Sequence, residues 1–396
     1  MSANTDFDTG RLDAWLERHV EGARGELKLA RIPGGQSNPT YFVDKGALRM
    51  VLRKQPAGDI LPSAHAVDRE YRIMSALAGT AAPVPRMLAF HAGRDVVGTP
   101  FYLMERLEGR VFHDNALPGL SREDRRAAYL SMAETLARLH SVDFAAAGLG
   151  DYGRPGNYFQ RQIARWSRQW ELSKTRELPD IEHLIPWLGA NIPADETSTI
   201  VHGDYRFGNL MLHPREPRVI AILDWELSTL GHPLADLAHS CIGWRVRPSD
   251  YGGLFGLDLD ALGVPAEAEY VEAYMRHAKH SARLQPFHVA FVLFRFAVIF
   301  EGISVDEAKE QLEQQRAKRN TAMHLGALIL GAPLQQGFGK RCRSGRPFRR
   351  SSKAWGQRKA FGTTTLPSTY FARLLFYKVF MLARCKATHQ AKGACS

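Results

Sequence analysis

The sequence has few cysteines, and they are unevenly placed. Of its 396 residues only four are cysteine, and three of these, Cys342, Cys385 and Cys395, lie near the C-terminal end. Cys241 stands alone in the body of the chain. We therefore predict no disulfide framework, and the spacing of the cysteines excludes a zinc site built on them.

Long apolar runs are also missing. The run at 291–300 is interrupted by Arg295, whereas a membrane-spanning helix needs about 20 apolar residues. The first residues, MSANTDFDTGRLDAW, carry early acidic residues and have no continuous apolar segment of the kind found in secretory signal peptides. These absences predict no membrane span and a cytoplasmic location.

Acidic residues are absent from the last part of the chain. No Asp or Glu follows Glu313, and residues 336–396 contain 14 Lys and Arg residues. The net charge of +11 comes from this segment, because residues 1–335 hold 38 basic and 41 acidic residues. One interpretation is a nucleic-acid or membrane-surface arm, since 371–384 mixes apolar and basic residues. We favour an appended or out-of-frame extension, disordered or adventitious, and predict no nucleic-acid partner.

The body of the chain has a strand-rich beginning and a helix-rich remainder. An opening helix at 11–20 is followed by a strand, turn and strand within 32–52. A helix at 65–77 and a buried strand at 99–107 complete the first part. Further helices are predicted at 121–140, 158–172, 266–283 and 286–303. This order predicts an α+β fold with a small sheet lobe and a larger, mainly helical lobe.

The most informative segment is 200–225, IVHGDYRFGNLMLHPREPRVIAILDW. His202, Asp204 and Asn209 fit the pattern H-x-D-x-x-x-x-N of a phosphotransferase catalytic loop, and Asp224 follows a short predicted hairpin. Phosphoryl transfer needs a carboxylate that orients a hydroxyl and accepts its proton, and an amide and a second carboxylate that hold magnesium. Each residue alone would be interpreted as a turn or cap residue. Their order and spacing together favour phosphotransfer.

This motif, with the apolar-DWE segment after it, resembles the aminoglycoside phosphotransferase and choline kinase superfamily. The resemblance is closest to the kinase-like branch found fused to, or beside, acyl-CoA dehydrogenases, and it covers about residues 10–330. The shared segments are GGQSNPTY (34–41), VLRKQPAG (51–58), SAHAVDREYRIMSAL (63–77), GTPFYLMERLEGRVF (98–112), YFQRQIARWSRQW (158–170) and WELSTLGHPLADLAH (225–239). It implies a protein-kinase-like fold with an N-terminal nucleotide-binding lobe (1–107), a C-terminal catalytic and substrate lobe (108–335) and the basic tail (336–396).

The resemblance also implies ATP and Mg²⁺ as cofactors and assigns roles to the motif. Asp204 becomes the catalytic carboxylate, and Asn209 and Asp224 become the magnesium ligands. His202 and Asp236 are implied to support the catalytic loop rather than to transfer protons.

In the small lobe, the resemblance implies that Glu70 orients a basic residue on a nearby strand. We take this residue as Arg53 rather than Lys54, because neighbouring strand residues point to opposite faces. An arginine can pair with Glu70 and also reach phosphate oxygens. The other predicted nucleotide-binding residues are Gly34, Gly35, Gln36, Ser37 and Asn38 in a loop, and Met104, Glu105 and Arg106 at the hinge.

The acceptor is less well defined by the sequence. Arg161, Arg165 and Arg168 fall on one helical face, which could bind an anionic substrate or could be a solvated, salt-bridged face. Residues 110–335 are only mildly acidic, which argues against cationic acceptors. We predict phosphorylation of a hydroxyl on a small molecule, a hydroxyacyl-CoA or another anionic metabolite. The alternatives are an aminoglycoside, amino-alcohol or sugar kinase, and a nucleotide-binding pseudokinase or scaffold.

Three further histidines, His213, His232 and His239, show no metal-ligand grouping, and we interpret them as structural. A functional association with an acyl-CoA dehydrogenase is implied by the resemblance alone. The oligomeric state is not determined by the sequence.

Overall fold

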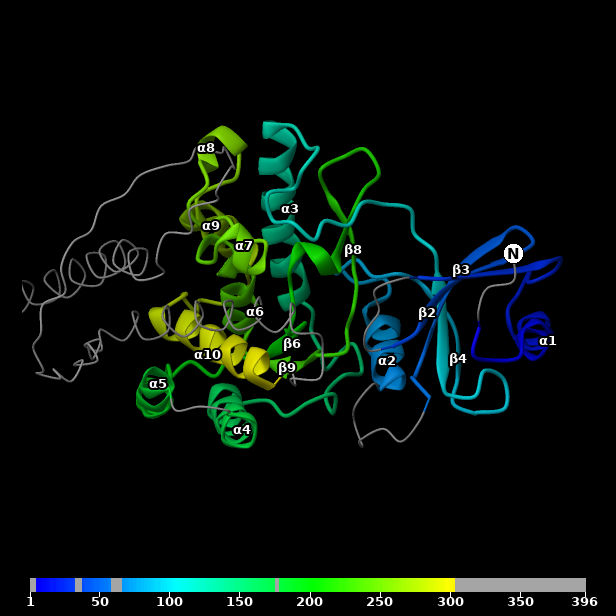
Figure 1. Cartoon of the computed structure of the whole chain (residues 1–396), viewed down its shortest axis with the longest axis horizontal. Helices are drawn as coiled ribbons and strands as arrows, with labels where there is room; N and C mark the ends of the chain where they lie inside the picture. Colours follow the sequence, from blue (N-terminus) through cyan, green and yellow to red (C-terminus); the bar gives the residue numbers. More distant parts are fainter. Residues whose placement is uncertain (1–4, 33–37, 58–65, 175–177, 303–396) are drawn as a thin grey trace, which may run out of the picture.

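The structure is a computed structural model that describes residues 5–32, 38–57, 66–174 and 178–302. A five-stranded antiparallel sheet lies at one end and a mainly helical part at the other (Figure 1). The predicted α+β arrangement is therefore observed. The basic segment 336–396 lies outside the described residues.

The strands of the small lobe follow the order β1-β2-β3-β5-β4. They are β1 (Leu27–Arg31), β2 (Thr40–Lys45), β3 (Leu48–Lys54), β4 (Met87–His91) and β5 (Phe101–Glu105). β2 and β3 form the predicted hairpin. Its turn requires Gly46, which has φ of +58° and would place a Cβ 2.1 Å from the Arg24 carbonyl oxygen. β1 and β4 escaped prediction because neither contains a β-branched residue or a fully buried side chain.

One helix covers each face of this sheet. Trp15 and Leu16 of α1 (Thr9–His19) pack with Leu52 and Phe101 in one core. On the other face, α2 (Val67–Leu77) packs with Tyr102 in a core that continues into the helical lobe. Successive residues of β3 therefore point to opposite faces of the sheet, and a helix packs against each face.

The large lobe is built from helices around two cores. Its helices are α3 (Arg122–His140), α4 (Tyr158–Ser173), α5 (Pro179–Ala190), α6 (Pro233–Ser240), α7 (Pro248–Tyr251), α8 (Leu259–Leu262), α9 (Glu267–His277) and α10 (Pro286–Gly302). α3 packs against α9, and α10 packs against α4, α5 and α6. The predicted Ser N-cap of α3 is present, with the Ser121 Oγ accepting the Asp124 N–H at 3.0 Å.

Two of the longer helices differ clearly from the prediction. The helix expected at 266–283 ends at His277, because Ala278 adopts an extended backbone with φ −72° and ψ 139°. α5 was not predicted at all, and the proline inside it, Pro186, obscures its helical pattern.

Two short pairs of antiparallel strands form between α5 and α6 in the chain. β6 (Thr199–Val201) pairs with β9 (Thr229–Gly231), and β7 (Leu210–Leu212) pairs with β8 (Val219–Ile222). The β7–β8 pair is the hairpin predicted ahead of Asp224. The loops that leave these strands carry the catalytic motif.

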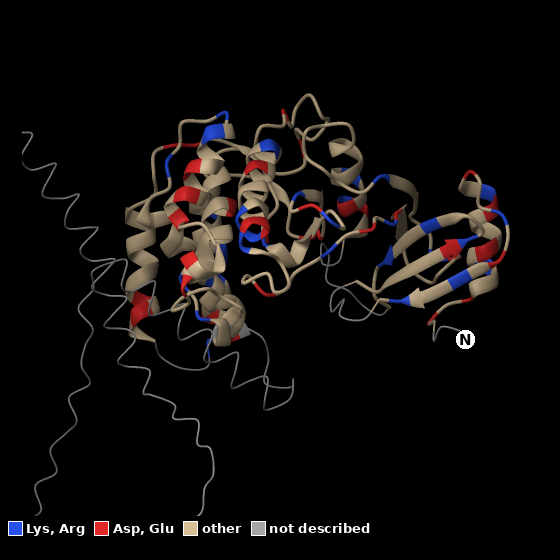
Figure 2. Cartoon of the chain, turned by 90° about the horizontal axis from the view of Figure 1, so that it is seen from above, with Lys and Arg blue, Asp and Glu red and all other residues tan. Residues whose placement is uncertain are grey.

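Lys and Arg residues are interspersed with Asp and Glu residues over the described part of the molecule (Figure 2). None of its helices is both long and apolar enough to cross a membrane. The mixture of both charge signs agrees with the near-neutral charge of residues 1–335.

Candidate active site

The HGD turn leaves β6 with a backbone that only glycine allows. Gly203 has φ of +87°, and a Cβ there would lie 2.7 Å from the Leu227 carbonyl oxygen. His202 is fully buried, and its Nε2 donates to the Leu223 carbonyl oxygen at 2.8 Å while its Nδ1 accepts from the Asp204 N–H at 3.2 Å. Both ring nitrogens of His202 are therefore used in holding the loop.

Asp236 of α6 is hydrogen-bonded to the backbone of the HGD turn. Its carboxylate accepts the backbone N–H groups of His202 at 2.6 Å and Gly203 at 2.8 Å. His140 Nε2 lies 3.3 Å from the same carboxylate, and the Tyr274 hydroxyl lies 2.7 Å from His140 Nδ1. Burial raises the pKa of Asp236, but the contacts with His140 and the loop outweigh it and leave the pKa below its usual value. The carboxylate stays ionised and fixes the loop backbone.

Asp204 is surrounded by hydrogen-bond donors. His239 Nε2 lies 2.9 Å from Oδ1, and Oδ2 accepts from Arg206 Nε at 3.1 Å and from Asn209 Nδ2 at 2.7 Å. Burial alone raises the pKa of Asp204, but the bond from His239 and the nearby positive charge hold it well below its usual range. Asp204 is a fixed carboxylate at neutral pH.

Asn209 and Asp224 lie next to each other across the β7–β8 pair. The Leu223 N–H donates to the Asn209 carbonyl oxygen at 2.8 Å, which places Asp224 beside Asn209. Asp224 has a positive φ of 63°, a backbone conformation that residues other than glycine adopt only at a cost in free energy. The strained backbone is of the kind that concentrates at functional sites.

Arg53 joins the small lobe to this site. Its Nε lies 3.1 Å from Glu70, and its Nη2 lies 2.8 Å from Asp224 and 3.5 Å from Glu226. Lys54 points to the opposite face of β3 and meets Asp6 at 2.8 Å. Of the two basic residues, Arg53 is the one that faces Glu70 and Asp224.

Glu70 is held by more donors than Arg53 alone. The Tyr102 hydroxyl donates to it at 3.0 Å and Asn38 Nδ2 at 2.9 Å. Burial raises the pKa of Glu70 to about 7, ahead of the lowering effect of Arg53. Of the predicted glycine-rich loop, only Asn38 is described, and residues 34–37 lie outside the described part.

In the predicted hinge segment 104–106, two backbone N–H groups already form hydrogen bonds within the protein. The Glu105 N–H donates to the Arg86 carbonyl oxygen at 2.9 Å, and the Arg106 N–H donates to that of Arg49 at 3.1 Å. Met104 pairs with Val51 in the sheet register. Any ligand at this edge must therefore use the other backbone groups of the segment.

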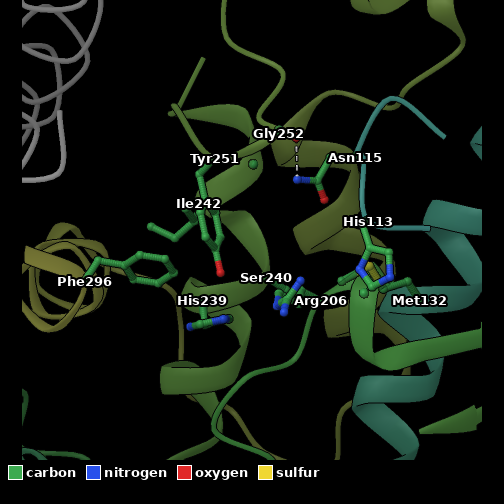
Figure 3. Close-up of a pocket in the computed structure, with 12 residues that line it drawn as sticks. His113, Asn115, Met132, Arg206, His239, Ser240, Ile242, Tyr251, Gly252 and Phe296 are labelled. Atoms are coloured by element: carbon green, nitrogen blue, oxygen red, sulfur yellow. Dashed lines mark hydrogen bonds between the residues drawn. The ribbon is translucent and has the colours of Figure 1, made fainter. Parts of the chain in front are cut away.

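A cavity of about 240 Å³ opens beside the catalytic loop. Arg206, His239 and Tyr251 point toward one another across it, with His113 and Asn115 on another side (Figure 3). Sequence reasoning missed both Arg206 and His239 as site residues. Arg206 had a usable signal, because it lies two residues after Asp204, whereas His239 reaches the loop only through the packing of α6.

The predicted arginine face of α4 lies elsewhere. Arg161 donates to the carbonyl oxygens of Arg154 and Gly156, and Arg165 and Arg168 are exposed. None of the three is among the residues that line the cavity. Their predicted role in substrate binding stays a prediction.

Two lobes meet at a site where one loop presents Asp204 and Asn209, a hairpin end presents Asp224, and the sheet contributes an Arg–Glu pair. This arrangement defines the class of kinase-like phosphotransferases. The chain belongs to the phosphotransferase enzyme family, whose sequence profile matches residues 28–287.

Two longer animal proteins are similar to this chain. Acyl-CoA dehydrogenase family member 10 from Mus musculus is 40% identical over 325 residues, which cover 78% of this chain and 30% of that protein. Acyl-CoA dehydrogenase family member 11 from Gallus gallus is 44% identical over 308 residues, which cover 75% of this chain and 39% of that protein. The chain thus spans less than half the length of these relatives.

Solved structures show the same fold. A Ralstonia eutropha protein assigned to the aminoglycoside phosphotransferases is 43% identical, with a TM-score of 0.75, covering 82% of this chain and 98% of that one. A ternary complex of an aminoglycoside phosphotransferase with AMP-PNP and hygromycin B is 16% identical, with a TM-score of 0.54, covering 80% of this chain and 98% of that one. The predicted protein-kinase-like fold is confirmed.

Proposed function

We propose that this chain transfers a phosphoryl group from ATP, with Mg²⁺, to a hydroxyl of a small molecule. The observation that carries the proposal is the carboxylate of Asp204, hydrogen-bonded to Asn209, together with Asp224, which lies beside Asn209 and pairs with Arg53. The AMP-PNP complex of a protein with this fold supports ATP as the donor. In this proposal, residues 1–107 form the nucleotide-binding lobe and residues 108–335 the catalytic lobe.

Asn209 and Asp224 fit magnesium by their chemistry. Asn209 turns its Nδ2 to Asp204, so its amide oxygen faces away from that carboxylate. An amide oxygen and a carboxylate are hard ligands suited to Mg²⁺, which usually takes only one or two protein groups beside phosphates and water. This explains why the described residues show no group of three His, Cys, Asp or Glu side chains that could hold a metal. Bound there, Mg²⁺ would neutralise charge on the phosphates.

Arg53 and Glu70 are proposed to hold the nucleotide. Glu70, fixed by Tyr102 and Asn38, keeps Arg53 at the mouth of the site, where its guanidinium can bind phosphate oxygens. The loop 34–38 and the hinge residues 104–106 are proposed as the remaining nucleotide contacts. Since two hinge N–H groups are already paired, adenine would bind to other backbone groups there.

Asp204 is proposed to orient the acceptor hydroxyl. Its low pKa makes it a weak base, so its main contribution is alignment of the hydroxyl for in-line attack. The hydroxyl proton passes to Asp204 as the new oxygen–phosphorus bond forms and the bond to the departing ADP breaks. His202 and Asp236 keep the loop in place and touch no reacting atom.

The cavity beside Asp204 is the proposed acceptor site. Among the described residues that line it none is acidic, and Arg206 places a guanidinium on its wall. Such a site suits an anionic acceptor better than a cationic one. With the names of the longer relatives, this supports a hydroxyacyl-CoA or a similar anionic metabolite and a function alongside an acyl-CoA dehydrogenase.

The test is an acceptor screen with the purified full chain, MgATP and four compound classes: hydroxyacyl-CoAs, sugars, amino alcohols and aminoglycosides. Asp204→Asn should lower turnover by about 10²- to 10⁴-fold while leaving ATP binding nearly unchanged, because the carboxylate acts on the acceptor. Wild-type turnover in the variant would refute the role of Asp204. Turnover with cationic compounds alone would refute the anionic acceptor, and ATP binding without turnover on any compound would favour a pseudokinase.

A further inference from the structure

His239 is a buried histidine whose ring contacts the proposed catalytic carboxylate directly. Its Nε2 lies 2.9 Å from Asp204 Oδ1, and the side chain is only 5% exposed. It sits on α6 three residues after Asp236, so both residues project from one face of that helix toward the loop. Phe296 of α10 packs against the ring, with a centroid distance of 5.2 Å. The ring is therefore fixed from both sides.

The protonation state of this pair follows from its surroundings. Burial lowers the pKa of His239, ahead of the opposing effect of Asp204, so the imidazole is neutral. Because the carboxylate can only accept, the single ring proton must lie on Nε2. Nδ1 is then an acceptor, and it is buried without a hydrogen-bond partner among the described residues.

The two oxygens of the Asp204 carboxylate have different hydrogen-bond donors. Arg206 and Asn209 both donate to Oδ2, whereas among the described residues His239 is the donor at Oδ1. Without His239, Oδ1 would lose its fixed partner, and the two remaining donors, both on Oδ2, would restrain rotation about the Cβ–Cγ bond less tightly. A hydroxyl-orienting group loses efficiency steeply with such misplacement.

We propose that His239 is a positioning residue for phosphotransfer: its Nε2–H fixes the rotation of the Asp204 carboxylate so that one oxygen faces the acceptor hydroxyl. The role of Asp204 that it serves rests on the proposed function above. His239 also lines the cavity proposed for the acceptor, and in this assignment its Nε2–H serves the Asp204 carboxylate rather than the acceptor. Its effect on the reaction therefore runs through Asp204.

The first test is structural and needs no turnover. In His239→Ala the Asp204 carboxylate should rotate away from its wild-type orientation in a crystal structure of the full chain. In His239→Gln, whose side-chain Nε2 can replace the lost donor, the orientation should be kept. A carboxylate unmoved in the alanine variant overturns the proposal, whether or not the chain proves to be a phosphotransferase.

The second test is kinetic. His239→Ala should lower kcat by about tenfold or more with little change in the KM for ATP, and His239→Gln should recover most of the loss. In an Asp204→Asn background the alanine change should have little further effect, because the residue acts through Asp204. Losses that add in the double variant, or an alanine variant as active as wild type, overturn the proposal.

A matched control separates positioning from packing. His288 is another buried histidine of the same lobe, and its Nδ1 accepts from the Gln285 N–H rather than from the catalytic loop. His288→Ala should leave kcat near the wild-type value. Equal losses in His288→Ala and His239→Ala would show a general packing effect and refute the specific role.

Discussion

Arg53 is the basic residue that lies within ion-pair distance of several carboxyl groups of the site. Its guanidinium faces three carboxyl groups, from Glu70, Asp224 and Glu226. Burial raises the pKa of Glu70, and the negative charges of Asp224 and Glu226 add to this against the lowering effect of Arg53. The negative charge beside Asp224 also favours a divalent cation there.

Glu70 should make the stability of the protein depend on pH. Burial raises its pKa from 4.5 to about 7, so between these values the folded chain binds a proton that the unfolded chain has lost. The resulting stability is fully present below the unfolded pKa and is lost as pH rises through 7. Without divalent cations, the free energy of unfolding of wild type relative to Glu70→Gln should fall by on the order of 2 kcal/mol between about pH 5 and about pH 8.

Urea unfolding across that pH range measures the difference. Glu272→Gln, at an exposed position on α9, is the matched control and should follow wild type throughout. A pH dependence of Glu70→Gln that runs parallel to that of wild type would contradict the raised pKa.

At the scale of elements, α6 organises the catalytic loop. Pro233 begins the helix, where its missing N–H costs nothing, and Asp236 in the first turn accepts two backbone N–H groups of the loop. One turn later His239 reaches Asp204. A single short helix thus fixes both the loop's backbone and its carboxylate.

Asp236→Asn should therefore destabilise the fold strongly. An amide NH₂ in place of one carboxylate oxygen would face a backbone N–H donor in a buried site, at a cost of about 2–4 kcal/mol. Asp258→Asn is the control, because Asp258 caps the exposed start of α8 and asparagine caps a helix equally well. Urea unfolding of the two variants makes the comparison, and equal midpoints would contradict the supporting role of Asp236.

At the scale of the molecule, the two lobes contact each other at the mouth of the site and also away from it. Besides the Arg53–Asp224 pair, Arg69 of α2 donates to the Tyr152 carbonyl oxygen at 3.0 Å, and Arg72 pairs with Asp151. The core around α2 also continues into the packing of α3. The lobes are therefore held together by more than the hinge.

Removing residues 336–396 should leave this molecule functional. The residues proposed for catalysis and nucleotide binding all precede residue 302, so we expect ATP affinity and the thermal midpoint of the shortened chain to match those of the full chain. Titration of both proteins with the ATP analogue AMP-PNP checks this. Loss of binding in the shortened chain would show that the segment contributes to the fold or the site.

The same pair of proteins tests the nucleic-acid alternative. A basic arm would bind DNA or RNA with an affinity that falls steeply with salt, because each phosphate contact releases counterions. We expect no salt-sensitive binding that depends on residues 336–396. Binding present in the full chain and absent in the shortened one would support the arm.

The sequence by itself determined the parts of this protein that depend on order and spacing along the chain. The catalytic-loop pattern and the hairpin before Asp224 follow from local residue types, and the alternation of β3 separates Arg53 from Lys54. Long, well-capped helices such as α3 were predicted for the same reason. Short, half-buried strands such as β1 have no comparable local signal.

The tertiary structure alone decided which distant residues complete the site. His239 lies 35 residues from Asp204 in the chain, and no local sequence pattern distinguishes it from a structural histidine. The packing of α6 brings its Nε2 to the Asp204 carboxylate. The convergence of Glu226 and Tyr102 on the Arg53–Glu70 pair is likewise a product of how the lobes meet. Such contacts depend on three-dimensional packing between elements, which no local pattern of residues encodes.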